Sequence, residues 1–155
     1  MPDLSLKDKV AIVTGGSGDI GGAIARKLAE QGATTIATFV GNEKAAAELV
    51  QSIQNNGGYA RAVQLDQRSS ESVNLLMENV RKTEGSLDIL INNAAWNIGI
   101  PFPQLDALTP EIWDRVLETN VRGPFLLARA GETMLKSGLG GHIVNISSAG
   151  GISPG

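Results

Sequence analysis

Cysteine is absent from the 155 residues of this chain. The sequence therefore excludes disulfide bonds, zinc sites built on thiolates and catalysis by a thiol, and it fits a reducing compartment. Histidine occurs once, as His142, and tyrosine once, as Tyr59. Because His142 stands directly before an apolar run, we interpret it as a structural or solvent-facing residue rather than a catalytic base.

Clustered positive charge and long apolar runs are missing as well. The formal net charge is −3, and no run of lysine and arginine offers a surface for a nucleic acid backbone. No apolar stretch approaches the roughly 20 residues of a membrane span, and residues 1–9 lack the apolar core of a secretory signal. We therefore expect a soluble, cytoplasmic protein with no nucleic acid or membrane partner.

Apolar runs alternate with helical patterns along the chain, which at 42% apolar residues can form one domain with a core. The patterns predict strands at 10–13, 34–40, 59–65, 87–91 and 142–146. They predict helices at 20–31, 43–55 and 69–83, a helix opened by Thr109-Pro110, and one long or two abutting helices at 118–136. Such alternation is typical of a doubly wound α/β fold, in which a parallel sheet of apolar strands is buried on both faces. We expect the strand order 3-2-1-4-5.

A glycine-rich turn, Thr14-Gly15-Gly16-Ser17-Gly18-Asp19-Ile20-Gly21, joins the first strand to the first helix. Such a turn directs backbone N–H groups and the positive end of a helix dipole at one point, which suits a pyrophosphate. Two glycine registers overlap, one using Gly16, Gly18 and Gly21 and the other Gly15 and Gly21. A glycine turn without a ligand is the alternative, and a kinase-type phosphate loop is disfavoured because no Gly-Lys-Ser/Thr follows.

The end of the second predicted strand reads Thr38-Phe39-Val40-Gly41 and has no acidic residue. A dinucleotide fold that prefers NAD carries an acid there for the ribose hydroxyl. Its absence favours NADP slightly over NAD, although no arginine is present for the 2′-phosphate. Asn42 and Lys44 are candidates for that contact, and an ordinary solvated helix start explains them equally well.

Further motifs follow the other strands in order: Asp66 after the third, Asn92-Asn93-Ala94-Ala95 after the fourth, Thr119-Asn120-Val121-x-Gly123 in a helical region, and Ile143-Val144-Asn145-Ile146-Ser147-Ser148 at the fifth. Together with the glycine turn, they make the chain resemble the short-chain dehydrogenase/reductase family from about Leu6 to Gly155. Within that family it is similar to 3-oxoacyl-carrier-protein reductases and to sugar or alcohol dehydrogenases.

The resemblance implies a single NAD(P)-binding Rossmann domain over residues 1–155, incomplete at its C-terminus and without the family's last strands. It implies hydride transfer between the cofactor and a small carbonyl or alcohol substrate. Members of the family are usually homo-oligomers, a state that we expect of a full-length form and not of these 155 residues. A dinucleotide-binding module without catalysis is the alternative function.

The resemblance also assigns roles to individual residues. Gly15, Ser17, Ile20 and Gly21 would cradle the cofactor phosphates, Asp66 would bond the adenine amino group, and Asn93 and Ala94 would line the adenosine ribose. Asn120 would hold a water of the proton relay, and Ser148 would bond the substrate oxygen. For Asp66 and Asn93 the alternatives are a turn aspartate and an asparagine that satisfies loop backbone. No metal ligand set is expected.

Two departures from the family pattern stand within these motifs, since Asp19 and Ala95 replace glycines. A carboxylate ~5 Å from a phosphate charge would cost about 3 kcal/mol at an effective dielectric constant near 20. We therefore predict that Asp19, although part of the cofactor turn, faces away from phosphate and caps the first helix.

The largest departure concerns the family's Tyr-x-x-x-Lys, in which a tyrosinate acts as acid and base beside a lysine that lowers its pKa. The one tyrosine here, Tyr59, is followed by Ala60-Arg61-Ala62-Val63 and lies in the wrong element. We expect the 155 residues to bind cofactor with negligible catalysis. We also expect the apolar faces of the last strand and of the 121–135 helix to be uncovered.

Overall fold

The computed structural model describes residues 5–137 and 140–151. All of its strands run parallel in one five-stranded sheet with the order β3-β2-β1-β4-β5, as predicted. The strands are β1 (Val10–Val13), β2 (Thr34–Phe39), β3 (Tyr59–Gln64), β4 (Ile89–Asn92) and β5 (His142–Asn145). The break in sequence order between β1 and β4 is the point at which a doubly wound sheet opens a crevice.

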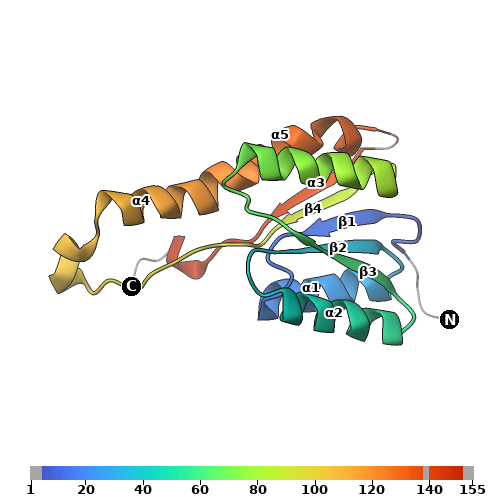
Figure 1. Cartoon of the computed structure of the whole chain (residues 1–155), viewed down its shortest axis with the longest axis horizontal. Helices are drawn as coiled ribbons and strands as arrows, with labels where there is room; N and C mark the ends of the chain where they lie inside the picture. Colours follow the sequence, from blue (N-terminus) through green and yellow to red (C-terminus); the bar gives the residue numbers. More distant parts are fainter. Residues whose placement is uncertain (1–4, 138–139, 152–155) are drawn as a thin grey trace.

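Two layers of helix cover the sheet (Figure 1). Helices α1 (Asp19–Glu30) and α2 (Glu43–Asn55) pack on one face, where small residues such as Ala11, Ala25 and Ala37 allow close approach. Helices α3 (Ser70–Thr83) and α5 (Gly123–Leu135) pack on the other face over a core of larger residues that includes Ile12, Leu76, Leu90 and Leu127. Within the described residues, no helix combines the length and the apolar character needed to cross a bilayer.

Capping residues lie at the ends of several helices. Ser69 caps α3, its Oγ accepting the amide of Ser72 at 3.2 Å. Thr109 caps α4 (Pro110–Leu117), its Oγ1 accepting the amide of Ile112 at 3.4 Å, with proline at the first helical position. Gly32, just past α1, has φ +94°, the left-handed conformation that favours glycine after a helix.

The helix predicted to open at Thr109-Pro110 and the region 118–136, predicted as one long or two abutting helices, form one rod with an irregular middle. Helix α4 passes into a π-helical turn, η2 (Glu118–Arg122), which passes into α5, and the junction residues keep right-handed helical dihedrals. The α4 end of the rod, with the 3₁₀ turn η1 (Phe102–Ala107), projects from the sheet (Figure 1). A second 3₁₀ turn, η3 (Ala149–Gly151), follows β5.

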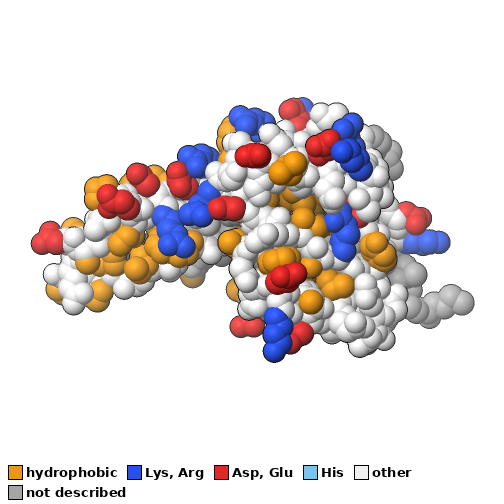
Figure 2. All heavy atoms as spheres, viewed as in Figure 1, with side chains coloured by type: hydrophobic (Ala, Val, Ile, Leu, Met, Phe, Trp, Pro, Cys, Tyr) orange, Lys and Arg blue, Asp and Glu red, His pale blue; other side chains and the backbone are white. Residues whose placement is uncertain are grey.

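The expectation that every strand is buried on both faces is wrong for β5, whose four residues are exposed. The strand lies at the sheet edge, and among the described strands only β4 pairs with it. Exposed apolar side chains also follow one side of the projecting rod, over which Figure 2 shows hydrophobic atoms gathering: Trp113, Leu117, Val121 and Phe125. The predicted uncovered faces are therefore present in the described part of the chain.

A charged pair ties the other sheet edge to α3. The Arg61 guanidinium on β3 donates from Nε and Nη2 to the two carboxylate oxygens of Glu84, both at 2.7 Å. The Glu84 side chain is only 5% exposed. Removing one member of such a pair leaves the other charge buried without its partner.

We predict that Arg61→Met lowers the free energy of unfolding by about 3 kcal/mol, because Glu84 keeps its burial and loses its counter-charge. Urea denaturation followed by circular dichroism measures the change. The matched control is Lys27→Met, which removes the exposed Lys27–Glu30 pair and should change stability by less than about 0.5 kcal/mol. Equal effects of the two substitutions would contradict a stabilising role for the Arg61–Glu84 pair.

Candidate cofactor-binding site

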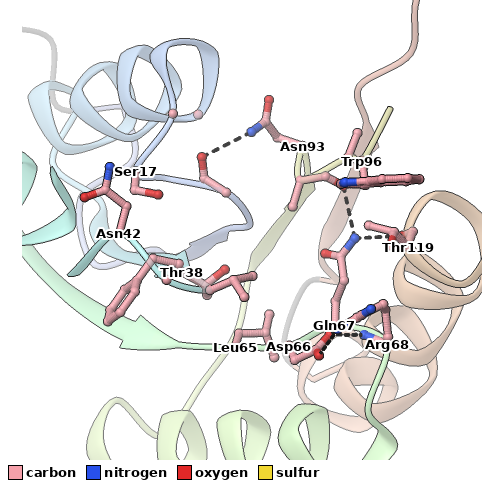
Figure 3. Close-up of a pocket in the computed structure, with 18 of the residues that line it drawn as sticks. Ser17, Thr38, Asn42, Leu65, Asp66, Gln67, Arg68, Asn93, Trp96 and Thr119 are labelled. Atoms are coloured by element: carbon pink, nitrogen blue, oxygen red, sulfur yellow. Dashed lines mark hydrogen bonds and ion pairs between the residues drawn. The ribbon is translucent and has the colours of Figure 1, made fainter. Parts of the chain in front are cut away.

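A cavity of about 680 Å³ opens at the carboxyl ends of the strands, beside the break between β1 and β4. Its wall is drawn from the β1–α1 turn, the end of β2, the loop after β3, the loop after β4 and helix α4 with its π turn (Figure 3). All eight residues that the sequence assigned to the cofactor line it: Gly15, Ser17, Asp19, Ile20, Gly21, Asp66, Asn93 and Ala94. The fold thus brings together side chains and backbone from three separate motifs.

The glycine turn forms the floor of this cavity, and its geometry separates the two possible registers. Gly15 has φ +67°, and a Cβ on Gly21 would fall on the Gly15 carbonyl oxygen. Gly16 instead packs against Ala37 of β2, where a Cβ would lie 2.6 Å from the alanine methyl, and it is not part of the lining. The Gly15 and Gly21 register therefore shapes the turn.

The amino end of α1 faces the cavity without a side-chain cap. Gly18 holds the cap position in extended conformation, and no side chain of the described residues accepts a hydrogen bond from the first turn. The first amides of a helix have no acceptor within it. Those of Asp19, Ile20 and Gly21 are therefore available to an anion, and the helix dipole favours negative charge there.

The prediction that Asp19 caps α1 is wrong. Asp19 is the first residue with helical conformation, one position past the cap, and its side chain makes no capping bond within the described structure. A capping side chain accepts the second or third amide of the helix from the residue just before it, whose backbone is extended. In this helix that residue is Gly18. Asp19 instead lines the cavity.

A buried hydroxyl joins the two strands between which the cavity opens. Thr14 Oγ1, at the end of β1, accepts the amides of Asn93 at 3.0 Å and Ala94 at 2.9 Å. The Asn93 side chain returns the contact, Nδ2 donating to the Thr14 carbonyl at 2.9 Å. Asn93 therefore satisfies backbone carbonyl groups of the turn, which was the alternative interpretation of this residue, and it also lines the cavity. Thr14 was quoted in the glycine turn without a role of its own, although its place between an apolar strand and a glycine marks it.

Asp66, after β3, is paired with an arginine that the sequence analysis did not single out. Its carboxylate accepts Arg68 Nε at 2.9 Å and Nη2 at 2.7 Å, and it also accepts the Arg68 amide at 3.0 Å (Figure 3). The Arg68 side chain, mainly through these hydrogen bonds, holds the pKa of Asp66 below its ordinary value. Asp66 is therefore an ionised hydrogen-bond acceptor on the cavity wall at neutral pH.

Other wall residues were not assigned a role from the sequence: Gln67, Trp96, Arg115 and Thr119. The Arg115 guanidinium lies 4.1 Å from the centre of the Trp96 ring, a stacked cation–π contact. These positions are set by tertiary packing of the π turn against two loops, which local sequence patterns do not report.

The two predicted catalytic residues lie outside the described lining. Asn120, exposed on the π turn, uses both ends of its amide on the Trp96 backbone: Oδ1 accepts the Trp96 amide at 2.8 Å, and Nδ2 donates to its carbonyl at 2.9 Å. Ser148, also exposed, accepts the Gly150 amide at 3.2 Å. The structure thus assembles the predicted cofactor residues at one place, and the two predicted catalytic residues are not part of that lining.

The end of β2 closes the far side of the cavity with Thr38, Phe39, Val40 and Gly41, followed by Asn42. Asn42 caps α2, its Oδ1 accepting the Ala45 amide at 3.1 Å. Lys44 is 88% exposed beside Glu48 and does not line the cavity. Of the two candidates for a 2′-phosphate contact, the geometry therefore retains Asn42. Elsewhere in the described residues, no cluster of histidine and acidic side chains is arranged to hold a metal ion.

Fold and site together define a doubly wound α/β protein with a phosphate-type turn at its switch point. Residues 9–155 match the family model described as short chain dehydrogenase. The chain belongs to the short-chain dehydrogenase family.

Relatives and solved structures of this family are similar to the whole described fold. Glucose 1-dehydrogenase 2 of Bacillus subtilis is 35% identical over 144 residues, which cover 92% of this chain and 55% of the relative. 3beta-hydroxysteroid dehydrogenase 1 of Eggerthella lenta is 35% identical over 150 residues, 96% of this chain and 56% of the relative. A short-chain dehydrogenase of Burkholderia cenocepacia, solved in complex with NADP, aligns with a TM-score of 0.88 at 35% identity, over 97% of this chain and 59% of that one. The chain spans about half the length of the curated relatives it matches.

We predict that Arg68→Met raises the pKa of Asp66 toward its ordinary value, because the carboxylate loses the two guanidinium donors and their positive charge and keeps only the backbone amide of residue 68. Carboxyl NMR titration measures the pKa directly. Since the folded-state pKa is the lower one, the pair stabilises the wild-type fold above about pH 4, and this stability is lost as the pH falls through the folded-state value. Lys27→Met is the control. An Asp66 that titrates at the same pH in Arg68→Met would contradict the assignment.

Proposed function

We propose that this chain forms the cofactor-binding part of an NAD(P)-dependent oxidoreductase that interconverts a carbonyl and an alcohol. The observation that carries the proposal is the convergence of all eight predicted cofactor residues on one cavity at the switch point of the sheet. Family membership supports the reaction class. The nicotinamide would supply the hydride chemistry, and the protein would bind and orient it.

The residues of the cavity fit a dinucleotide. The uncapped first turn of α1 offers amide donors for a pyrophosphate, and the Gly15 and Gly21 backbones leave room for it to approach. The ionised Asp66 offers an acceptor for an adenine amino group, and Asn93 and Ala94 form the wall beside it. Asp19, which no described side chain neutralises by an ion pair, is the one feature of the turn that opposes a phosphate.

We propose NADP as the preferred cofactor. The end of β2 places no acidic side chain on the cavity, so nothing there would repel a 2′-phosphate. The Asn42 side chain uses its oxygen for capping, which leaves its Nδ2 as a donor toward an added phosphate. A similar solved structure contains NADP, which supports the same preference.

Proton transfer and substrate binding need residues other than those that line the cavity. Asn120 and Ser148 would contribute to proton relay and substrate binding. Tyr59 stands at the first residue of β3, the end of the strand away from the cavity, and is separated from it by the strand itself. This placement also favours the second candidate function, a dinucleotide-binding module without turnover. A substrate class within the carbonyls, a cytoplasmic location and a homo-oligomeric full-length form stay predictions.

We predict that the chain binds NADPH more tightly than NADH, and that Asn42→Asp weakens NADPH binding about tenfold with little effect on NADH. Aspartate keeps the helix cap and adds a negative charge that repels the 2′-phosphate. Isothermal titration gives the dissociation constants. Lys44→Ala is the control, expected to leave both constants within about twofold because Lys44 faces solvent. Equal or tighter binding of NADH by the wild type would overturn the preference.

We predict that the purified 155-residue chain oxidises no NADPH above background with a panel of keto substrates, while binding the cofactor. The reason is that proton transfer to the substrate oxygen lacks its positioned tyrosine. Absorbance at the nicotinamide band measures turnover, and a full-length family member serves as the positive control. Substrate-dependent NADPH oxidation by the 155 residues would refute this prediction.

A further inference from the structure

One wall residue of the cavity, Gln67, is a buried amide shared by three chain segments. Gln67 lies in the loop after β3 and is only 4% exposed. Nε2 donates to the Ala94 carbonyl at 3.0 Å and to the Thr119 carbonyl at 2.7 Å (Figure 3). It thereby connects the loop after β3 to the loop after β4 and to the π turn.

The Thr119 carbonyl needs a donor from outside its helix for a reason that lies in the sequence. In α-helical geometry its donor would be the Gly123 amide, but in the π turn that amide bonds to the Glu118 carbonyl, five residues back. With the same five-residue spacing, the donor to the Thr119 carbonyl would be the amide of residue 124. That residue is Pro124, which has no N–H. A carbonyl left without a donor at a buried contact destabilises the fold, and Gln67 supplies the missing hydrogen bond.

Space for this contact is made by a glycine on the π turn side. A Cβ on Gly123 would lie 2.7 Å from Gln67 Cγ and 3.0 Å from Nε2. The roles of three residues are therefore complementary. Pro124 lacks the amide that would bond the Thr119 carbonyl, Gln67 supplies a side-chain donor instead, and Gly123 leaves space for the Gln67 side chain. Each of the three residues would be unremarkable alone.

The next residue after Thr119 is Asn120, whose side-chain amide forms two hydrogen bonds with the Trp96 backbone. Trp96 in turn lines the cavity beneath Arg115. The position of the Thr119 carbonyl therefore sets the position of Asn120, and Asn120 sets the course of the loop after β4 along the cavity.

We propose that Gln67 is a positioning residue: it replaces the hydrogen bond that Pro124 removes from the π turn, and so fixes Asn120 and Trp96 against the cofactor cavity. The cofactor part of this inference rests on the proposed function. The structural part, the coupling of Gln67 to Pro124 and to Trp96, stands independently of any ligand.

A double-mutant cycle on stability tests the coupling. Gln67→Met keeps the side-chain length and removes the donor, and it should raise the equilibrium constant of unfolding about tenfold. Pro124→Ala restores an amide N–H next to the Thr119 carbonyl. In that background Gln67→Met should raise the constant only about threefold, because the bond to the Ala94 carbonyl is still lost while the Thr119 carbonyl has a new donor. Gln54→Met is the matched control, since Gln54 Nε2 donates to the Ala60 carbonyl at 3.3 Å far from the π turn, and Pro124→Ala should not alter its effect.

A second readout separates positioning from mere support of the fold. In a Trp113→Phe background Trp96 is the sole tryptophan, so its emission reports on the cavity wall. Gln67→Met should shift the Trp96 emission maximum and weaken NADPH binding about tenfold, and Pro124→Ala should diminish both effects. Gln54→Met should change neither.

The outcomes are distinct. A smaller effect of Gln67→Met beside Pro124→Ala in both experiments supports the proposal. An unfolding effect of Gln67→Met that persists undiminished beside Pro124→Ala, or an unchanged Trp96 emission, overturns it. If Gln67→Met alone does not fold, the double variant must fold, and its failure to do so also overturns the proposal. If the wild type binds neither NADPH nor NADH, the proposed function fails, whereas the emission and unfolding measurements still decide the role of Gln67.

Discussion

The hydroxyl of Thr14 holds together the two strands between which the cavity opens. At a switch point, adjacent strands send their following loops to opposite faces of the sheet, so the strand ends must be joined by something other than a common helix. Thr14 accepts two amides from the loop after β4, and Asn93 binds back to the β1 backbone. This small, fully buried connection sets the distance between the glycine turn and the Asn93–Trp96 wall, and every other cavity contact is placed relative to it.

The glycine turn shows how the same residues serve folding and binding. A capping side chain would stabilise α1 by about 1 kcal/mol, and the chain places Gly18 at the cap position instead. The amides of the first turn are consequently left for a ligand, at a loss of stability in the free protein. Asp19 recovers part of that loss through the helix dipole, and the same charge opposes a bound phosphate. The negative charge of Asp19 therefore stabilises the fold and weakens the binding of a phosphate.

The sequence predicts the architecture well because each element is marked locally. Apolar runs bounded by glycine, capping residues such as Ser69 and Thr109, and the order of the motifs were enough for the strand order and for the eight residues that meet at the cavity. The failures have physical causes. Asp19 was assigned a capping role because residue type does not reveal whether the backbone at that position is extended or helical. The exposure of β5 depends on what lies beside it, which its own apolar residues do not report.

The wall around Gln67 shows why the rest of the site was beyond local sequence patterns. A π turn has no distinct side-chain period, and here the Gly123 amide bonds to the Glu118 carbonyl while the Thr119 carbonyl accepts its hydrogen bond from Gln67, 52 residues earlier in the chain. The absence of a donor at Pro124 is visible in the sequence, but it acquires meaning only when the Thr119 carbonyl is seen to be buried against another loop. A proline near the middle of a helical rod would ordinarily be interpreted as the start of a new helix. In this protein it also determines which side chain must reach the helix from across the cavity, and that requirement connects the cofactor wall to the segment bearing Asn120.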